Sequence, residues 1–298
     1  MQANSSTRLT TGGTPLRIAM QKSGRLSEGS IALLREMGLE FETYKDRLFV
    51  SARNMGVDIL FLRDDDIPEY VQDGVAHLGI VGSNILEERR PAVDRLLNLD
   101  FGYCTLKIAV PEESEINRLD DLTGKRIATS YPEALRRFLA EKKIEATPVL
   151  LRGSVEVTPA LGVADAICDL VSTGSTLRTH GLRAIQTVFE SQAVLICQPN
   201  MKPEKSVFVQ KLLMRAKGVQ DGRRCKYIMF NAPRSALELI KQRIPACRSP
   251  TIMDLADQKF VAVHTVITPE DAFWEVVESI RDCGGSDILV APIEKFIR

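Results

Sequence analysis

The sequence predicts an α/β protein with two lobes and a small C-terminal domain. Three observations support this fold class. Residues 16–90 contain three units in which a short apolar run is followed by a turn and a helix, the pattern of a parallel sheet wrapped by helices. Further strands follow in a second lobe, and the chain returns through strands at 184–189 and 193–197. Residues 226–292 have the order β-α-β-β-α-β of a ferredoxin-like unit.

Three apolar runs predict the strands of the first lobe, each leading into a helix: Leu16–Met20, Val57–Leu62 and His77–Val81. The first loop carries Lys22 and Arg25, and a basic loop at a helix start suits a triphosphate or pyrophosphate. Taken alone, such a loop is more often an ordinary solvated connection. The acids Asp64–Asp66 follow the second strand and could bind a cation, but the helix dipole explains them more simply. The third strand leads through a loop to a helix at 85–90.

The second lobe is predicted from strands at 106–110 and 126–129. Pro132 suits the first position of a helix that runs to Lys142. Because the chain crosses into this lobe and later returns, we expect a cleft between the two lobes.

The stretch Leu151–His180 carries the strongest functional signal. Ala166–Val171 is an apolar run with one acid, Asp169, which predicts a buried strand with the acid near its carboxyl end. Small and hydroxyl-bearing residues follow at 172–176 and lead into a helix, an arrangement that binds anions through backbone N–H groups. An isolated match of this kind is usually an ordinary polar turn. However, a buried acid needs a partner, and Glu156 repeats the feature in the short β-like run 154–157, so a phosphosugar site is an equally good interpretation.

Composition excludes several functional classes. The chain has 298 residues, with 39 Lys plus Arg against 39 Asp plus Glu, so charge gives no argument for binding nucleic acid or an anionic membrane. No apolar run is long enough for a membrane helix. Residues 1–14 have no apolar core of a secretory signal and predict a disordered tail. The six cysteines are widely spaced and predict buried thiols in a reducing cytoplasm, and the three histidines show no zinc spacing.

The C-terminal unit is predicted from strands at 226–232, 251–253, 260–266 and 286–292, with helices at 235–244 and from a cap at Thr268–Asp271 to Asp282. It contains no obvious catalytic residue, which favours a regulatory or assembly module. His264 is interpreted as a packed or exposed residue and not as a ligand.

Two segments, Gly153–Val157 and Asp169–Leu177, resemble the ATP phosphoribosyltransferase family, which performs the first step of histidine biosynthesis. The likeness covers nearly the whole chain and includes further segments: Gln21–Leu26, Arg63–Ile67, Leu99–Gly102, Ala128–Pro132 and Pro292–Lys295. The C-terminal unit makes the chain similar to the long form, which senses histidine itself, whereas the short form needs a separate regulatory subunit.

The resemblance implies a glycosyltransferase with a periplasmic-binding-protein-like pair of catalytic lobes. It implies transfer of the phosphoribosyl group of phosphoribosyl pyrophosphate to N1 of ATP, a magnesium requirement, inhibition by histidine, and cytoplasmic dimers that assemble into hexamers. The implied domains are lobe I at 15–103 and 186–222, lobe II at 104–185, and a histidine-binding domain at 223–298.

The family's roles fall on matching positions of this sequence. The implied catalytic acids are Asp169 and Glu156, which either bind magnesium or leave it mainly to the substrates. The implied phosphoribosyl pyrophosphate loop consists of Ser172, Thr173, Gly174, Ser175 and Thr176. The implied ATP side consists of Lys22, Gly24, Arg25, Leu26, Asn84 and Tyr131. Relatives often have alanine in place of Ser175 and aspartate in place of His77, which weakens any role for the latter position.

Polar groups near loops of the C-terminal unit suit an amino acid, because an α-amino group needs a carboxylate and an α-carboxylate needs N–H groups. The residues predicted to bind histidine are Asp254, Asp257, Thr265, Ser286 and Asp287.

Two other functions are compatible with these observations. A type I phosphoribosyltransferase has two adjacent acids before its loop, and Leu170 after Asp169 argues against that class. A cytoplasmic sensor would bind phosphoribosyl pyrophosphate without turnover. Release of pyrophosphate from a mixture of both substrates and magnesium separates an enzyme from a sensor.

Overall fold

The computed structural model describes residues 14–44, 46–201, 203–243, 250–267 and 273–297. By its internal contacts the chain divides into two compact units, one of Met1–Ala32 with Leu39–Ser206 and one of Leu33–Gly38 with Val207–Arg298. Residues 1–13 of the predicted N-terminal tail, the helix cap at Thr268–Asp271 and Cys247 lie outside the described residues.

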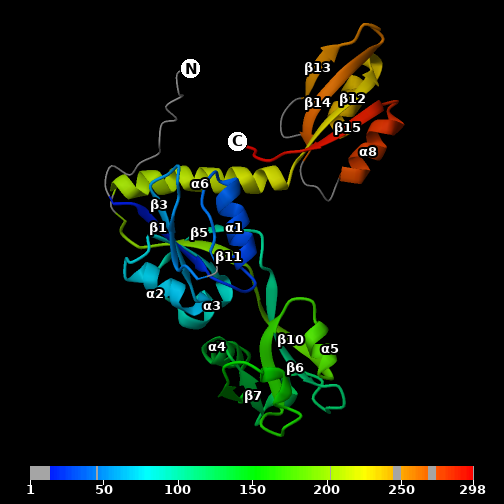
Figure 1. The fold of residues 1–298 in the computed structure, drawn as a ribbon. Coiled ribbons are helices and arrows are strands. Elements are labelled where there is room, and N and C mark those ends of the chain that lie inside the picture. The colour runs from blue at the N-terminus through cyan, green and yellow to red at the C-terminus, as the bar shows by residue number, and fades with distance from the viewer. Residues whose placement is uncertain (1–13, 45, 202, 244–249, 268–272, 298) are drawn as a thin grey trace. The chain divides into compact units, whose positions relative to one another are not determined.

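The first sheet has six strands in the order β2-β3-β1-β4-β11-β5 (Figure 1). Its strands are β1 Leu16–Gln21, β2 Phe49–Ser51, β3 Val57–Leu62, β4 Leu78–Gly82, β5 Asp94–Asn98 and β11 Ala193–Cys197. β1 pairs in parallel with β3 and β4, which confirms the predicted parallel core and brings three carboxyl ends to one edge. β2, β5 and β11 add antiparallel pairings. The sequence did not predict β2 and β5, which are short and lie at the two edges of the sheet.

Helical segments follow the three parallel strands: α1 Ser27–Glu36, η1 Asp64–Asp66 with α2 Ile67–Gln72, and α3 Ser83–Arg89. Ile67 and Val71 of α2, with Ile85 of α3, join a core with Ala19 and Val81 of the sheet. The third helix begins at Ser83, two residues before the predicted start, so Asn84 lies in its first turn and not in a loop. We call this sheet, its loops, α2 and α3 lobe I.

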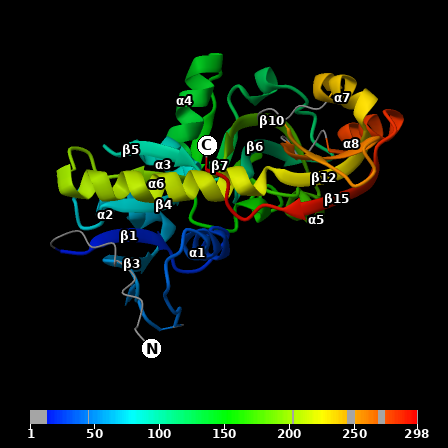
Figure 2. The same cartoon turned by 90° about the horizontal axis from the view of Figure 1, so that it is seen from above.

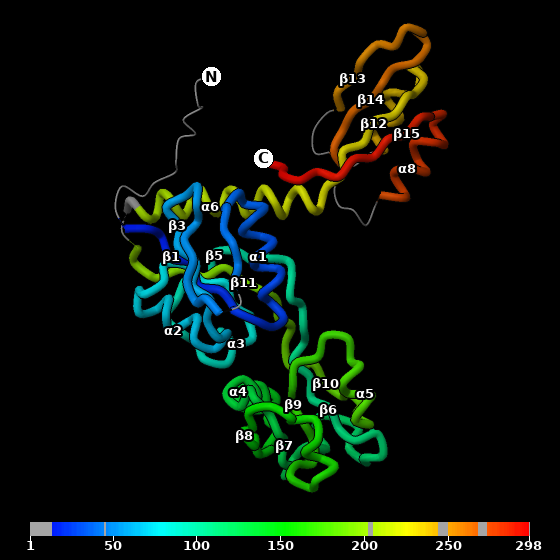
Figure 3. Tube along the Cα trace, viewed as in Figure 1, coloured from blue at the N-terminus to red at the C-terminus, as the bar shows by residue number. Residues whose placement is uncertain are grey.

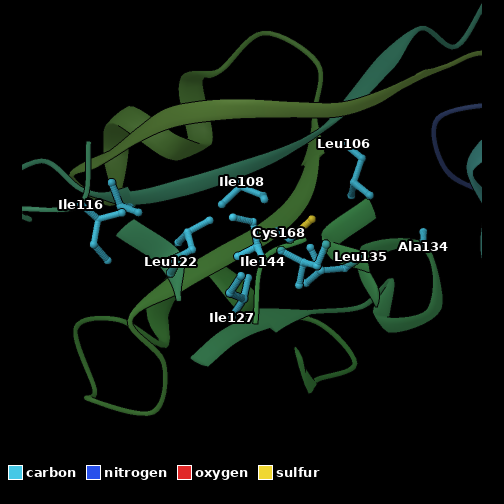
Figure 4. Close-up of a cluster of buried hydrophobic side chains, with 12 residues drawn as sticks. Leu106, Ile108, Ile116, Leu122, Ile127, Ala134, Leu135, Ile144 and Cys168 are labelled. Atoms are coloured by element: carbon cyan, nitrogen blue, oxygen red, sulfur yellow. The ribbon is translucent and has the colours of Figure 1, made fainter. Parts of the chain in front are cut away.

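The second sheet has five strands in the order β10-β6-β9-β7-β8. Its elements are β6 Cys104–Pro111, η2 Leu119–Leu122, β7 Arg126–Thr129, α4 Pro132–Lys142, β8 Thr147–Leu150, η3 Val155–Val157, β9 Ala166–Val171, α5 Ser175–Thr179 and β10 Leu182–Ser191. Figure 4 shows its core, in which Ile108, Ile127, Leu135 and Cys168 point toward one another. We call this sheet and its helices lobe II. β10 belongs to it up to Ser191, beyond the predicted end of lobe II at residue 185.

One local prediction is wrong. Residues 154–157 do not form a β-like run; Val155–Val157 is a short 3₁₀ helix. Ser154 has a φ of 50° and a left-handed backbone, which turns the chain out of an extended path. Thr158 closes the turn by donating its hydroxyl to the Val155 carbonyl at 2.7 Å.

The C-terminal sheet has the order β13-β14-β12-β15 with every pair antiparallel, which confirms the ferredoxin-like prediction (Figure 3). Its elements are β12 Lys226–Pro233, η4 Arg234–Ala236, α7 Leu237–Arg243, β13 Thr251–Asp254, β14 Phe260–Ile267, α8 Phe273–Asp282 and β15 Ser286–Pro292. Ile240 of α7 and Ile280 of α8 are buried with Phe230 and Val263. His264 makes a 2.7 Å hydrogen bond through Nδ1 with the Tyr227 hydroxyl.

The long helix α6, Pro203–Arg223, was not predicted from the sequence (Figure 2). Its buried side chains Phe208, Leu212, Ala216 and Val219 recur at helical spacing, so the signal was present. A β-carbon at Gly222 would lie 2.8 Å from the backbone of Glu294, so only glycine lets the C-terminal segment approach this closely. None of the helices in the described ranges has the length and apolar character needed to cross a membrane.

Candidate active site

Basic residues lie where the parallel strands of lobe I end. Lys22 and Arg25 are exposed in the loop after β1. The Arg25 guanidinium donates to the carbonyl of Gly102. It also lies 3.7 Å from the place that a β-carbon of Gly82, the last residue of β4, would occupy. The structure thus brings Arg25 to the end of a second strand, at the edge where α/β sheets bind ligands.

Gly24 and Leu26 make hydrogen bonds that stabilise this loop. The Gly24 carbonyl accepts the N–H of Ser27 at 3.1 Å. The Leu26 side chain is 1% exposed, and its N–H donates to Gln21 Oε1 at 2.9 Å. Leu26 therefore holds the loop that presents Lys22 and Arg25, and its side chain is not available to a ligand.

Asp64 is a residue of this edge to which sequence reasoning gave no site role. Its Oδ1 is buried and has no hydrogen-bond partner among the described residues. Burial raises the pKa of Asp64 to about 6, with the charge of Asp65 adding to the effect and Arg25 and the Gly82 backbone opposing it. Buried carboxylate oxygens without partners are rare and concentrate at functional sites. The sequence pattern that could have indicated Asp64 is an acid directly after a buried strand, but the helix dipole also explains an acid at that position.

We expect Asp64→Asn to stabilise the protein near neutral pH. A carboxyl group whose folded pKa is raised from 3.8 to about 6 gives stability that is present in acid and lost as the pH rises through this interval. The asparagine cannot ionise, so its advantage in unfolding free energy should grow between pH 4 and 6 and level off at about 1–3 kcal/mol. Urea unfolding across this pH range measures it. The control is Asp65→Asn, an exposed neighbour that lies 3.6 Å from Arg89 and should change little. An advantage for Asp64→Asn that is the same at every pH would contradict the assignment.

Tyr131 connects the two lobes. Its hydroxyl accepts a 3.2 Å hydrogen bond from Nδ2 of Asn84, which is 1% exposed on α3. Burial raises the pKa of Tyr131, the charges of Asp169, Asp64 and Asp65 raise it further, and the Asn84 hydrogen bond acts against them. Tyr131 therefore remains a neutral phenol amid acids from both lobes, and it brings the predicted ATP side together with Asp169.

Asp169 and Glu156 are two acids of lobe II that interact electrostatically. Asp169 lies near the carboxyl end of β9, opposite Lys107 of β6, and its Oδ1 accepts the N–H of Leu170 at 2.8 Å. Burial raises the pKa of Asp169, the Leu170 N–H opposes this, and the charge of Glu156 adds to it. The pair thus suits a developing positive charge or a cation, which would relieve both the burial and the repulsion.

The hydroxyl-bearing loop follows directly. Its four hydroxyl residues, Ser172, Thr173, Ser175 and Thr176, are exposed, and the Thr173 and Ser175 hydroxyls lie 2.9 Å apart. Gly174 has a φ of 74°, the left-handed backbone that favours glycine. Arg178, one helical turn later, reaches to 3.5 Å from the place of a Gly174 β-carbon. Arg178 was missed from the sequence, although its spacing from Gly174 on a helix indicated it.

Asp169 and Glu156 are of the chemical type that binds magnesium. No group of three or more His, Cys, Asp or Glu side chains that could hold a metal occurs among the residues that the structure describes. Asp169 and Glu156 could supply two carboxylates, and magnesium in phosphate-transfer sites is commonly held by one or two carboxylates with substrate phosphates.

His77 has a structural role. It precedes β4, at the end of the strand opposite the site edge, and its Nδ1 accepts the N–H of Arg17 at 3.0 Å. Its Nε2 lies 2.5 Å from Lys205 Nζ. Burial and the charges of Lys205 and Arg17 lower the pKa of His77 to about 4, so the imidazole is neutral.

The predicted histidine-binding residues do not all lie together. Ser286 Oγ and Asn231 Nδ2 each donate to Asp287 Oδ2 at 3.0 Å. Asp254 forms an ion pair with Arg234, and Asp257 Oδ1 accepts the N–H of Lys259 at 3.0 Å.

Thr265 is set apart from these acids. It is 7% exposed and pairs with Ile228, whereas Asp254 pairs with Val261 four positions earlier on β14. The structure places Asp254 at the end of β13, Asp287 near the start of β15 and Asp257 between strands, all three exposed, whereas Thr265 is buried within the sheet.

Comparison with known proteins identifies the family. The family model described as "HisG: ATP phosphoribosyltransferase" matches residues 63–218, and "HisG, C-terminal domain" matches residues 222–295. An ATP phosphoribosyltransferase of Cytophaga hutchinsonii is 44% identical over 285 residues, covering 96% of this chain and 99% of that protein. The solved ATP phosphoribosyl transferase (HisG:HisZ) complex from Thermotoga maritima matches with a TM-score of 0.59 and 26% identity, covering 68% of this chain and 96% of that one. The predicted two-lobed α/β fold with an added C-terminal domain is thereby confirmed, and the chain belongs to the ATP phosphoribosyltransferase family of histidine biosynthesis, in its long form.

Proposed function

We propose that the enzyme transfers the phosphoribosyl group of phosphoribosyl pyrophosphate to N1 of the adenine of ATP, the first step of L-histidine biosynthesis. The observation that carries this proposal is Asp169, which lies directly before a hydroxyl-bearing loop and whose pKa is raised further by the charge of Glu156. The hydrogen bond between Asn84 and Tyr131 joins lobe II to lobe I. The 5-phosphate binds to residues 172–176, with Arg178 adding positive charge, and ATP binds at the lobe I edge near Lys22 and Arg25.

In this reaction a bond forms between adenine N1 and ribose C1, and the bond between C1 and the pyrophosphate oxygen breaks. Positive charge develops on the ribose in the transition state, and the leaving pyrophosphate becomes more negative. Asp169 and Glu156 stabilise the ribose cation, and the half-buried setting of Asp169 strengthens this effect. N1 already carries a lone pair, so no general base is required.

The leaving group needs positive charge. Lys22 and Arg25 are exposed cations at the carboxyl edge of lobe I and can pair with its phosphates. Magnesium, when bound with the substrates and the two acids, supplies charge neutralisation of the pyrophosphate. Most of the catalytic effect then comes from the positioning of two anionic substrates.

We further infer a cytoplasmic enzyme in which residues 223–298 bind histidine and inhibit catalysis. The solved relative is named as a complex with HisZ. This chain carries its own C-terminal domain, so we infer that it assembles with copies of itself, as dimers and hexamers. Asp254, Asp257 and Asp287 are the exposed carboxylates that could take the α-amino group.

The experiment that tests the reaction is release of pyrophosphate from ATP, phosphoribosyl pyrophosphate and magnesium, with each substrate omitted in turn. We expect pyrophosphate to be released only when both substrates are present. Binding of phosphoribosyl pyrophosphate without any release would favour the sensor function.

We expect Gly174→Ala and Thr173→Val to weaken the binding of phosphoribosyl pyrophosphate more than the binding of ATP. Alanine is strained at a φ of 74°, and valine removes a hydroxyl of the loop. A loss of about tenfold or more in affinity corresponds to one charge-assisted hydrogen bond. Separate calorimetric titrations of the two substrates measure the difference. Gly162→Ala is the matched control, because Gly162 has a φ of 68° in a loop to which no site residue is assigned. Equal losses for both substrates would contradict the loop assignment.

A further inference from the structure

Helix α4 of lobe II begins without a cap of its own. Tyr131 occupies the N-cap position and makes no capping bond with its side chain. Pro132 follows and has no N–H to donate. The next two N–H groups, those of Glu133 and Ala134, are the ones that an N-cap side chain normally accepts.

One carboxylate from the other lobe accepts both N–H groups. Glu88 of α3 receives the Glu133 N–H on Oε1 at 3.0 Å and the Ala134 N–H on Oε2 at 2.8 Å. A negative charge at the start of a helix is favoured by the helix dipole as well as by the two bonds. Lobe I thus supplies the cap that lobe II lacks.

A second contact lies one turn away on the same helix. Asn84 and Glu88 are four residues apart on α3, so they share a face. Asn84 donates to the Tyr131 hydroxyl at 3.2 Å, and Ser191 holds Asn84 through its N–H at 2.9 Å and its Oδ1 at 3.0 Å. Ser191 ends β10, where the chain returns from lobe II to lobe I. The α3–α4 junction, defined by Asn84, Glu88, Tyr131, Glu133 and Ala134, therefore links the two lobes beside the proposed site.

We propose that Glu88 is a positioning residue of the transfer reaction, which fixes the start of α4, and Tyr131 with it, against lobe I. The proposal rests on the proposed function, in which ATP binds at the edge of lobe I and the 5-phosphate of phosphoribosyl pyrophosphate binds to lobe II. Adenine N1 and ribose C1 must then meet across the two lobes. A displacement of about 1 Å between reacting groups can cost about 10²-fold in rate. Glu88 touches neither substrate and acts through the helix that it caps.

The test compares Glu88→Ala and Glu88→Gln with Glu87→Ala in the full-length enzyme. Glu87 is the adjacent acid of α3, and its side chain pairs with Arg95 of the same lobe at 2.7 Å. Its backbone carbonyl, which accepts from Arg137, is unchanged by the substitution. We expect kcat to fall about 10–100-fold in Glu88→Ala. Glutamine keeps one acceptor oxygen, so kcat should fall less in Glu88→Gln than in Glu88→Ala. The kcat of Glu87→Ala should stay close to that of the wild type.

Two further readouts separate positioning from damage to the fold. Calorimetric titration of each substrate alone should give unchanged stoichiometry in Glu88→Ala, because Glu88 touches neither substrate. Hydrogen exchange, followed by mass spectrometry on the peptide that contains Glu133 and Ala134, should become faster in Glu88→Ala and not in Glu87→Ala.

The proposal is supported by lower kcat and faster exchange with binding retained. It is overturned if kcat is unchanged, whether or not exchange is faster, or if the loss of kcat is matched by a loss of binding stoichiometry. A wild-type protein that releases no pyrophosphate would refute the proposed function, and the positioning role with it. An active wild type with an equally active Glu88→Ala would refute the positioning role alone.

Discussion

Asp169→Asn is expected to lower kcat/KM by about 10²–10³ while the protein stays folded, the usual effect of removing one electrostatic contact to a transition state. Asp169 is half-buried near the end of β9, and its pKa is raised mainly by that burial. A carboxylate held in such a place interacts strongly with a developing positive charge. Asparagine keeps the shape and the acceptor for the Leu170 N–H but removes the charge.

Steady-state kinetics on the purified variant measure this loss, and a thermal unfolding scan checks the fold. Asp165→Asn is the matched control, because Asp165 immediately precedes β9 at its opposite end and accepts the Arg126 N–H at 2.8 Å. Asp165→Asn should therefore affect stability more than turnover. An unchanged kcat/KM in Asp169→Asn would show that Asp169 does not stabilise the transition state.

Truncation after Gly222 is expected to abolish inhibition by histidine. The removed part is a complete βαββαβ unit with its own core, and no catalytic candidate falls in it. Inhibition from such a domain requires that histidine favour one arrangement of the protein over another, a coupling typically worth about 1–3 kcal/mol. Activity assays with increasing histidine measure the effect in both forms.

The truncation also removes the segment that packs on α6, where the Phe296 N–H donates to the Gly218 carbonyl at 2.7 Å. A point variant therefore accompanies it. Asp287→Asn in the full-length chain should weaken histidine binding without changing catalysis. Asp282→Asn serves as its control, because Asp282 is an exposed acid at the end of α8. Histidine that binds the truncated enzyme equally well and competes with ATP would place the effector in the catalytic region instead.

The parts of the fold that the sequence predicted are those with a strong local pattern. β1, β3 and β9 are apolar runs bounded by turns, and the C-terminal unit alternates strands and helices at regular spacing. The 3₁₀ turn at Val155–Val157 was misread because two valines favour an extended chain, whereas Ser154 turns it. Helix α6 was overlooked although its buried residues had helical spacing.

The candidate site was predicted as separate motifs and not as an assembly. Asp169 and the loop after it are adjacent in sequence, so the local pattern was enough to predict them as a site. The contact of Asn84 with Tyr131 spans 47 positions, and the capping of α4 by Glu88 spans 45. Contacts of this range depend on how the lobes pack, which no local pattern encodes. Asp64 was set aside because its burial, and the absence of a partner for Oδ1 among the described residues, appear only in three dimensions.

The central claim is that this enzyme joins ribose C1 to adenine N1. The most direct test is an NMR experiment on the wild-type enzyme with ATP labelled with ¹⁵N at N1 and phosphoribosyl pyrophosphate labelled with ¹³C at C1. We expect a one-bond coupling between the two labels to appear, together with an equal amount of pyrophosphate. Pyrophosphate without that coupling, or no pyrophosphate from correctly folded protein, would contradict the claim.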